Sequence, residues 1–191
     1  MQLTNDDVRR AITAPFLRSE IAAATVEMSL SQFHDWRGVR AKRHRIQPPP
    51  AKNRRLSAWS LMDVAALFAL RVIEVNVPFS LADRKSLVDM LRRDGGRWFT
   101  ALCTGSLEPD EYLFLTFCPQ GEPRFTVHQG REAKIPAKCG DFKVVVDLSG
   151  ALRDGARQAI AMWRVLDRQA QLAPLLLPAL QAIEKECARA V

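Results

Sequence analysis

A run of basic side chains between residues 37 and 55 is the part of the sequence best suited to chemistry with a partner molecule. Eight Lys and Arg residues, and no Asp or Glu, stand in this run: Arg37, Arg40, Lys42, Arg43, Arg45, Lys52, Arg54 and Arg55. The chain has 28 basic and 21 acidic residues, which gives a formal net charge of +7. Outside the run there are 20 basic and 21 acidic residues, so the excess positive charge lies within the run. Such a local excess attracts polyanions, and the run is not an amphipathic helix of the kind that binds membrane surfaces. Double-stranded DNA is therefore the expected partner, and a membrane is not.

Three consecutive prolines at positions 48 to 50 restrict the shape of this run. Each proline lacks a backbone N–H and restricts the residue before it, so a continuous helix is excluded. We expect a basic, proline-stiffened loop between two helices. Trp36 and Trp59 stand at its two ends, where we expect them to pack into the core rather than to stack on bases.

The residues just before this loop have the pattern of a short helix, residues 29 to 37. Its apolar side chains recur at helical spacing, which leaves four polar side chains pointing elsewhere: Ser31, Gln32, His34 and Asp35. Another short helix is predicted from residue 19 to about residue 26, and two short helices joined by a tight turn form a helix-turn-helix candidate. The polar residues of the second helix would then read base edges, with Gln32 suited to adenine and Asp35 to the amino group of cytosine.

Capping residues mark further helix starts: Thr4 before Asn5, Asp6 and Asp7, Ser60 before Asp63, and Ser80 before Asp83. The first of these helices ends at Pro15. The second, over residues 61 to 75, has a broad apolar stripe and should be largely buried. The third runs from residue 81 to about residue 93, and the sequence Asp-Gly-Gly at residues 94 to 96 is expected to end it and to separate two domains.

Beyond residue 96 the hydrophobic period changes from that of a helix to that of a strand. Aromatic and β-branched residues dominate four predicted strands, residues 97–103, 112–118, 124–129 and 141–148. Their short connections favour antiparallel pairing, and the nearly continuous apolar character of residues 112–118 and of the valines at 144–146 suggests central strands. A small antiparallel sheet is therefore expected.

A helical tail completes the predicted α+β domain of residues 96–191. It begins at Ser149 or Asp154 and is interrupted by Pro174 and Pro178. The segment that follows is apolar enough for exposure to water to be costly, at about 25 cal/mol per Å². We expect this segment to cover the sheet or a twofold-related copy of the chain, so that the domain dimerises, senses a ligand, or does both.

Four short motifs in the N-terminal half occur in a familiar order: Phe16-Leu-Arg-Ser-Glu20-Ile21-Ala22, Phe33-His-Asp-Trp36, Trp59-Ser60-Leu-Met-Asp63-Val64 and Pro78-Phe79-Ser80-Leu81. In this order they resemble the DNA-binding domain of the MerR family of transcription regulators. The resemblance implies a winged helix-turn-helix over residues 16–94, preceded by a helical extension, residues 1–15. Its recognition helix, residues 29–37, would enter the major groove, and its basic wing, residues 37–55, would contact phosphates or a minor groove.

The residues expected to contact DNA follow from the charge pattern and from this resemblance. They are Ser31, Gln32, His34, Asp35, Arg37, Arg40, Lys42, Arg43, His44, Arg45, Lys52, Arg54 and Arg55. The chain departs from the family at Val26-Glu27, where Thr-Gly-Val is usual, and its wing is longer and richer in proline. No single long dimerisation helix follows the fourth helix, so the metal and drug ligands of the family are not carried over.

The function expected from the sequence is a sequence-specific DNA-binding transcription regulator that forms a homodimer through its C-terminal domain. Two alternatives stay open: a DNA-architectural or recombination accessory protein, and a protein-interaction module such as an adaptor or antitoxin. A small apolar effector between the sheet and residues 175–180 is a further possibility that rests on composition.

Enzymatic chemistry is not expected, since neither a nucleotide-binding glycine loop nor a nucleophile motif is present. His34 and Asp35 are adjacent in a helix and so point to different faces. The acidic cluster of residues 108–111 is expected to be a solvated loop. The four cysteines are scattered without a metal-binding spacing, so no cofactor is expected, although a site gathered from three of them is an alternative. With no signal peptide and no long apolar run, we expect a cytoplasmic protein.

Overall fold

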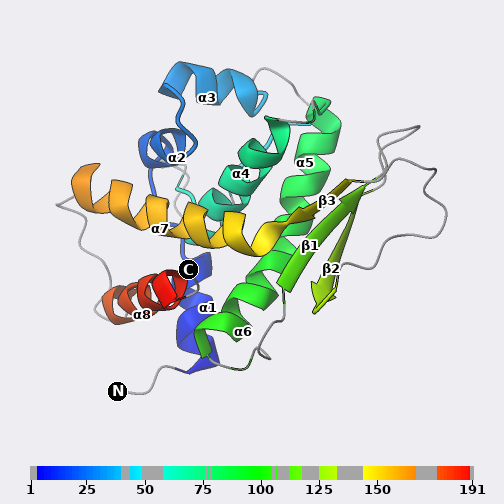
Figure 1. Ribbon diagram of the computed structural model, residues 1–191. Helices are drawn as coiled ribbons and strands as arrows, with labels where there is room; N and C mark the ends of the chain where they lie inside the picture. The colour runs from blue at the N-terminus through cyan, green and yellow to red at the C-terminus, as the bar shows by residue number, and fades with distance from the viewer. Residues whose placement is uncertain are drawn as a thin grey trace.

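The computed structural model describes residues 4–39, 44–48, 58–75, 77, 79–104, 106, 112–117, 125–132, 144–166 and 176–189. The helices are α1 (Asn5–Thr13), α2 (Ser19–Thr25), α3 (Leu30–Trp36), α4 (Leu61–Glu74), α5 (Leu81–Met90), the π-helix η1 (Leu91–Gly95), α6 (Gly96–Thr104), α7 (Leu148–Leu166) and α8 (Leu176–Arg189). The strands are β1 (Tyr112–Phe117), β2 (Phe125–Gly130) and β3 (Val144–Asp147). Helices combined with a small antiparallel sheet agree with the predicted α+β class (Figure 1).

Side-chain caps fix the beginnings of four helices. Thr4, Ser29, Ser60 and Ser80 each accept a hydrogen bond from the backbone N–H three residues later, and the side chain of that third residue accepts one from the capping residue's N–H. Such a reciprocal capping box satisfies donors that the first helical turn leaves free. The predicted starts after Thr4, Ser60 and Ser80 are therefore confirmed, because this chemistry is local to a few residues.

Helix α4 is the buried centre of the structure, as its broad apolar stripe predicts. Ten of its residues are buried, and α7 packs along it. The two helices approach closely at Gly155, where a Cβ atom would lie 2.8 Å from Cβ of Phe68 and 3.0 Å from Cα of Ala65. Elements from both sides of residues 94–96 contribute to one hydrophobic core.

The predicted helix end at residues 94–96 and the predicted strand over residues 97–103 are both wrong. Helix α5 continues through η1 into α6, so the backbone stays helical from Leu81 to Thr104. Gly95 is buried, and a Cβ atom there would lie 2.9 Å from Cε of Met62, so this glycine permits close packing instead of ending the helix. Trp98 and Phe99 are each 1% exposed, so burial outweighs the preference of aromatic residues for strands.

The sheet has the strand order β2-β1-β3 with both pairs antiparallel. The prediction that β1 is central is confirmed, whereas the valines of β3 lie at an edge of the described sheet, contrary to expectation. The first turn of α7 contacts β1, where the backbone N–H of Leu113 donates to Oγ of Ser149 at 2.7 Å. His128 of β2 pairs with the hydroxyl of Thr116 at 3.0 Å, which is a structural contact within the sheet.

Helix α8 covers other helices, not the sheet. Its buried residues include Leu180 and Ile183, and it packs on α1, α7 and α6. The sequence correctly indicates an apolar face, but it does not specify the partners, which are these three helices. Pro178 lies within the first turn of α8, where a missing N–H costs no internal hydrogen bond. Within the described ranges, no helix combines the length and the apolar character needed to cross a membrane.

Candidate nucleic-acid interface

Helices α2 and α3 form a two-helix unit that stands at one end of the structure (Figure 1). Between them the backbone N–H of Met28 donates to the carbonyl of Ala23 at 2.9 Å, which closes a tight turn. Glu27 within this turn has a φ of 57°, the left-handed region that favours glycine. The turn predicted between the two short helices is therefore present, although a glutamate occupies its left-handed position.

The inner side of α3 is held by aromatic packing and by an ion pair. Phe33 is fully buried, and its ring lies 5.8 Å from that of Trp59 and 6.2 Å from that of Trp36. The indole N–H of Trp36 donates to Oε2 of Glu74 at 2.6 Å, and Arg84 pairs with the other oxygen of this carboxylate. Arg84 also donates to the carbonyl of Trp36 at 3.1 Å. These contacts fix α3 on α4 and α5.

The outer side of α3 carries the residues expected to read bases. Ser31, Gln32 and Asp35 are exposed and His34 is half-buried, so the structure brings all four to one accessible helix. Gln32 has a second task, since its Oε1 accepts from the backbone N–H of Ser29 at 2.9 Å. Its Nε2 is the group left to donate toward a base, because the carbonyl oxygen serves the helix cap.

Arg37 differs from its expected role at a phosphate. The residue is 4% exposed, and its guanidinium carbon lies 5.6 Å from the ring centre of Phe33 and 5.4 Å from that of Trp59. Its Nη1 donates to the carbonyl of Ile46 at 3.4 Å. Burial, and secondly the charge of Arg45, lower the pKa of the Arg37 guanidinium. In this conformation Arg37 supports the base of the wing and cannot reach a phosphate.

Residues 44–48, a described segment of the predicted wing, are docked against the helical core. Ile46 is 1% exposed, and its backbone N–H donates to the carbonyl of Arg37 at 3.0 Å. His44 is exposed and Arg45 is half-buried. Six further wing residues of the predicted interface lie outside the described residues: Arg40, Lys42, Arg43, Lys52, Arg54 and Arg55.

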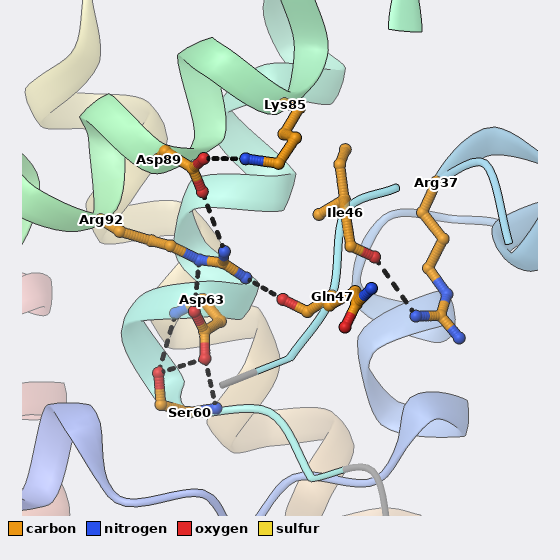
Figure 2. A network of polar contacts seen from close by, with 8 residues as sticks. All are labelled: Arg37, Ile46, Gln47, Ser60, Asp63, Lys85, Asp89 and Arg92. Carbon is orange, nitrogen blue, oxygen red and sulfur yellow. Dashed lines mark hydrogen bonds and ion pairs between the residues drawn. The ribbon is translucent and has the colours of Figure 1, made fainter. Parts of the chain in front are cut away.

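One guanidinium joins this wing segment to two helices (Figure 2). Nη2 of Arg92 donates to the carbonyl of Gln47 at 2.7 Å, and its Nε lies 2.6 Å from Oδ1 of Asp63. The other oxygen of Asp63 accepts from the N–H and hydroxyl of Ser60 at 2.9 and 2.7 Å, so this carboxylate both caps α4 and holds Arg92. Arg92 also pairs with Asp89 at 3.3 Å.

Sequence reasoning identified Asp63 as a cap but missed Arg92. An arginine near the end of an amphipathic helix normally extends into water, and nothing in its neighbours distinguishes one that turns inward. We compared the chain with models of protein families, with curated proteins and with solved structures, and none of the three comparisons found a match.

Proposed function

We propose that this protein is a sequence-specific DNA-binding transcription regulator in which α3 enters the major groove. The observation that carries the proposal is the accessible polar side of α3, formed by Ser31, Gln32, His34 and Asp35, on a two-helix unit whose other side packs against the core. Recognition helices of helix-turn-helix proteins place residues near their N-terminus against base edges. Ser31 and Gln32 occupy this position in α3.

The basic wing supplies the affinity that does not depend on sequence. It begins at the end of α3, and its residue Ile46 is docked on the core next to that end. Lysine and arginine contacts to phosphates release condensed counterions and orient the protein on the duplex. No acidic residue stands between residues 37 and 55, so the segment itself offers no carboxylate that would compete with DNA for these cations.

A second candidate function is binding of DNA without sequence preference, as in an architectural or recombination accessory protein. The participation of Gln32 in the capping box favours it, because this use of Oε1 leaves the helix with few groups for bidentate readout of a base. Both candidates share the wing and its phosphate contacts. They differ in whether the exposed side of α3 discriminates among bases.

Selection of bound fragments from a pool of randomised duplex DNA tests the proposal. The purified full-length chain is expected to enrich a defined site, to protect it in footprinting, and to bind it more weakly as salt concentration rises. Enrichment of no common site, with affinity that is equal for all fragments, would favour the architectural function. Absence of DNA affinity at low salt would contradict both and favour a protein-interaction module.

Dimerisation through the C-terminal part belongs to the same proposal. Exposed apolar side chains at Val165, Leu166 and Leu177 stand on α7 and α8, with exposed fractions of 64%, 53% and 44%. A twofold partner would cover them and would pair two copies of α3, as recognition of two half-sites requires. Sedimentation analysis is expected to give twice the monomer mass, and a monomer at micromolar concentration would contradict this part.

A further inference from the structure

An open cleft between α1, η1 and α6 carries an unusual concentration of guanidinium groups. Its volume is about 630 Å³, which falls in the range of sites for small molecules. Arg9 of α1, Arg92 and Arg93 of η1, and Arg97 of α6 line it, and none of its described lining residues is acidic. We call these four residues and the space between them the basic cleft.

The arginines of the basic cleft are not equally neutralised. Arg92 is paired with Asp63 and Asp89, and Arg93 makes two hydrogen bonds of 2.9 Å to the neighbouring Asp94. Arg9 and Arg97 are exposed and have no salt-bridge partner within the described part of the chain. Arg9 and Arg97 therefore line the cleft from two helices, and no described carboxylate pairs with either, a combination suited to an anion with several oxygens.

The other polar groups of the cleft leave recognition to these arginines. The hydroxyl of Thr13 donates to the carbonyl of Arg9 at 2.7 Å, and that of Thr100 donates to the carbonyl of Gly96 at 2.8 Å. Their protons are thus committed to the helices. The π-helix η1 contributes Arg92 and Arg93, and π-helical turns within longer helices are frequent at functional sites.

We propose that the basic cleft binds a small ligand that carries a phosphate or pyrophosphate group. A phosphate presents several oxygens in the geometry that a guanidinium fork matches with paired hydrogen bonds, and Arg9 and Arg97 supply two such forks. The cleft is concave and has room for the rest of a metabolite beyond the phosphate. The binding itself does not depend on the proposed DNA function.

The position of the cleft favours a small molecule over the phosphates of DNA. Helices α1 and α6 lie at one end of the structure, and α3 lies at the other (Figure 1). The α1 and α6 walls of the basic cleft, which carry Arg9 and Arg97, are therefore remote from a duplex docked on α3. The two sources of phosphate can be distinguished by mutation. Loss of Arg9 and Arg97 lowers the affinity for DNA only if these arginines contact the DNA backbone.

Arg92 connects the cleft to the wing. It lines the cleft and at the same time donates to the carbonyl of Gln47, which holds residues 44–48 on the core (Figure 2). A phosphate in the cleft competes for this guanidinium and weakens the attachment of the wing segment. The ligand is thus linked to the proposed DNA interface, and this regulatory part of the inference rests on the proposed function.

Calorimetric titration of the full-length protein with inorganic pyrophosphate, against sodium chloride at equal ionic strength, tests the site. Binding is expected for the wild type, and Arg9→Gln and Arg97→Gln are each expected to weaken it about tenfold, the loss of one charge-assisted contact. Arg10→Gln is the matched control, since Arg10 is exposed on α1 but does not line the cleft. No heat of binding in the wild type, or equal losses in all three variants, would overturn the proposal.

Two further measurements separate the parts of the inference. Hydrogen exchange of the amides in residues 44–47 is expected to accelerate with pyrophosphate, and unchanged exchange at saturating ligand would overturn the link to the wing. The double variant Arg9→Gln/Arg97→Gln is expected to keep its affinity for DNA. If the double variant also loses affinity for DNA, the cleft binds the DNA backbone and the small-ligand site is overturned. If the protein binds pyrophosphate but no DNA, the proposed function is contradicted and the site is retained.

Discussion

Nε of Arg92 lies 2.6 Å from Oδ1 of Asp63, and this ion pair links the π-helix η1 to the capping box of α4. The side chain of Asp63 is 3% exposed and that of Arg92 is 23% exposed, so the pair is shielded from water on one side. The same guanidinium reaches the carbonyl of Gln47 in the wing. One side chain therefore connects the buried centre, the basic cleft and the wing.

Removal of this guanidinium is expected to destabilise the fold. Arg92→Met keeps much of the side-chain volume but leaves the carboxylate of Asp63 buried without its cation, which costs about 2–4 kcal/mol. Lys85→Met is the control, because the exposed pair of Lys85 with Asp89 contributes less than about 1 kcal/mol. Urea unfolding followed by circular dichroism measures both changes. Equal losses of unfolding free energy in the two variants would show that the buried pair contributes no more to stability than the exposed pair.

Close packing of α4 on α7 should make Gly155 intolerant of any side chain. Gly155→Ala forces the new methyl group against Phe68 and the backbone of Ala65, and we expect a loss of about 1–3 kcal/mol despite the better helix propensity of alanine. Gly150→Ala lies in the same helix with no atom within 4 Å of the new Cβ, so it should be neutral or stabilising by up to about 1 kcal/mol. Melting temperatures that fall equally for both variants would contradict this packing.

The left-handed backbone of Glu27 gives a test of the turn between α2 and α3. Glycine adopts this conformation without steric cost, so Glu27→Gly should leave the stability unchanged or raise it by up to about 1 kcal/mol. Glu27→Val places a β-branched residue at the same φ and should cost about 1–3 kcal/mol. Thermal unfolding of both variants measures which of them is more stable. A valine variant more stable than the glycine variant would exclude this turn geometry.

Burial of the Cys187 thiol predicts a loss of stability in alkaline solution. Desolvation raises the pKa of this thiol from the ordinary 9.0 to about 12, so the folded state keeps the proton while the unfolded chain releases it. The contribution of Cys187 is therefore complete below pH 9 and declines by about 1.4 kcal/mol per pH unit as the pH rises toward 12. The cost of Cys187→Ala, measured by unfolding at pH 8 and pH 10.5, should be smaller at the higher pH. A cost that does not change with pH would mean that the thiol ionises equally in both states.

The sequence predicts best those features that a few neighbouring residues determine. Ser60 and Asp63 form a cap wherever a helix begins with them, and the helical period of α3 suffices to separate Phe33 from Gln32. The prediction at Gly95 is wrong because a glycine after a helix usually ends it, whereas here the missing side chain makes room for Met62. Whether the helix ends at Gly95 thus depends on a contact between residues far apart in the sequence.

The candidate interface also combines features that the sequence predicts with features that it does not. The accessible polar side of α3 follows from its period, but the inward turn of Arg37 does not, because any cation in a basic run looks equally exposed in the sequence. Arg37 is buried by Phe33 and Trp59, which lie on opposite sides of the wing along the chain. The basic cleft likewise gathers Arg9 and Arg97 from helices that only the folded chain brings together.

The base preference of a Gln32→Glu variant, determined by selection from randomised duplex DNA, tests the central claim most directly. Glutamate is the usual third residue of a capping box, so the cap of α3 is retained while the donor at Nε2 is lost. Gln181→Glu introduces the same charge at an exposed position on α8 and serves as the control. We predict that Gln32→Glu changes the preferred base within a confined part of the selected site while Gln181→Glu leaves the site unchanged. An identical preferred site for the wild type and Gln32→Glu would contradict base reading by α3.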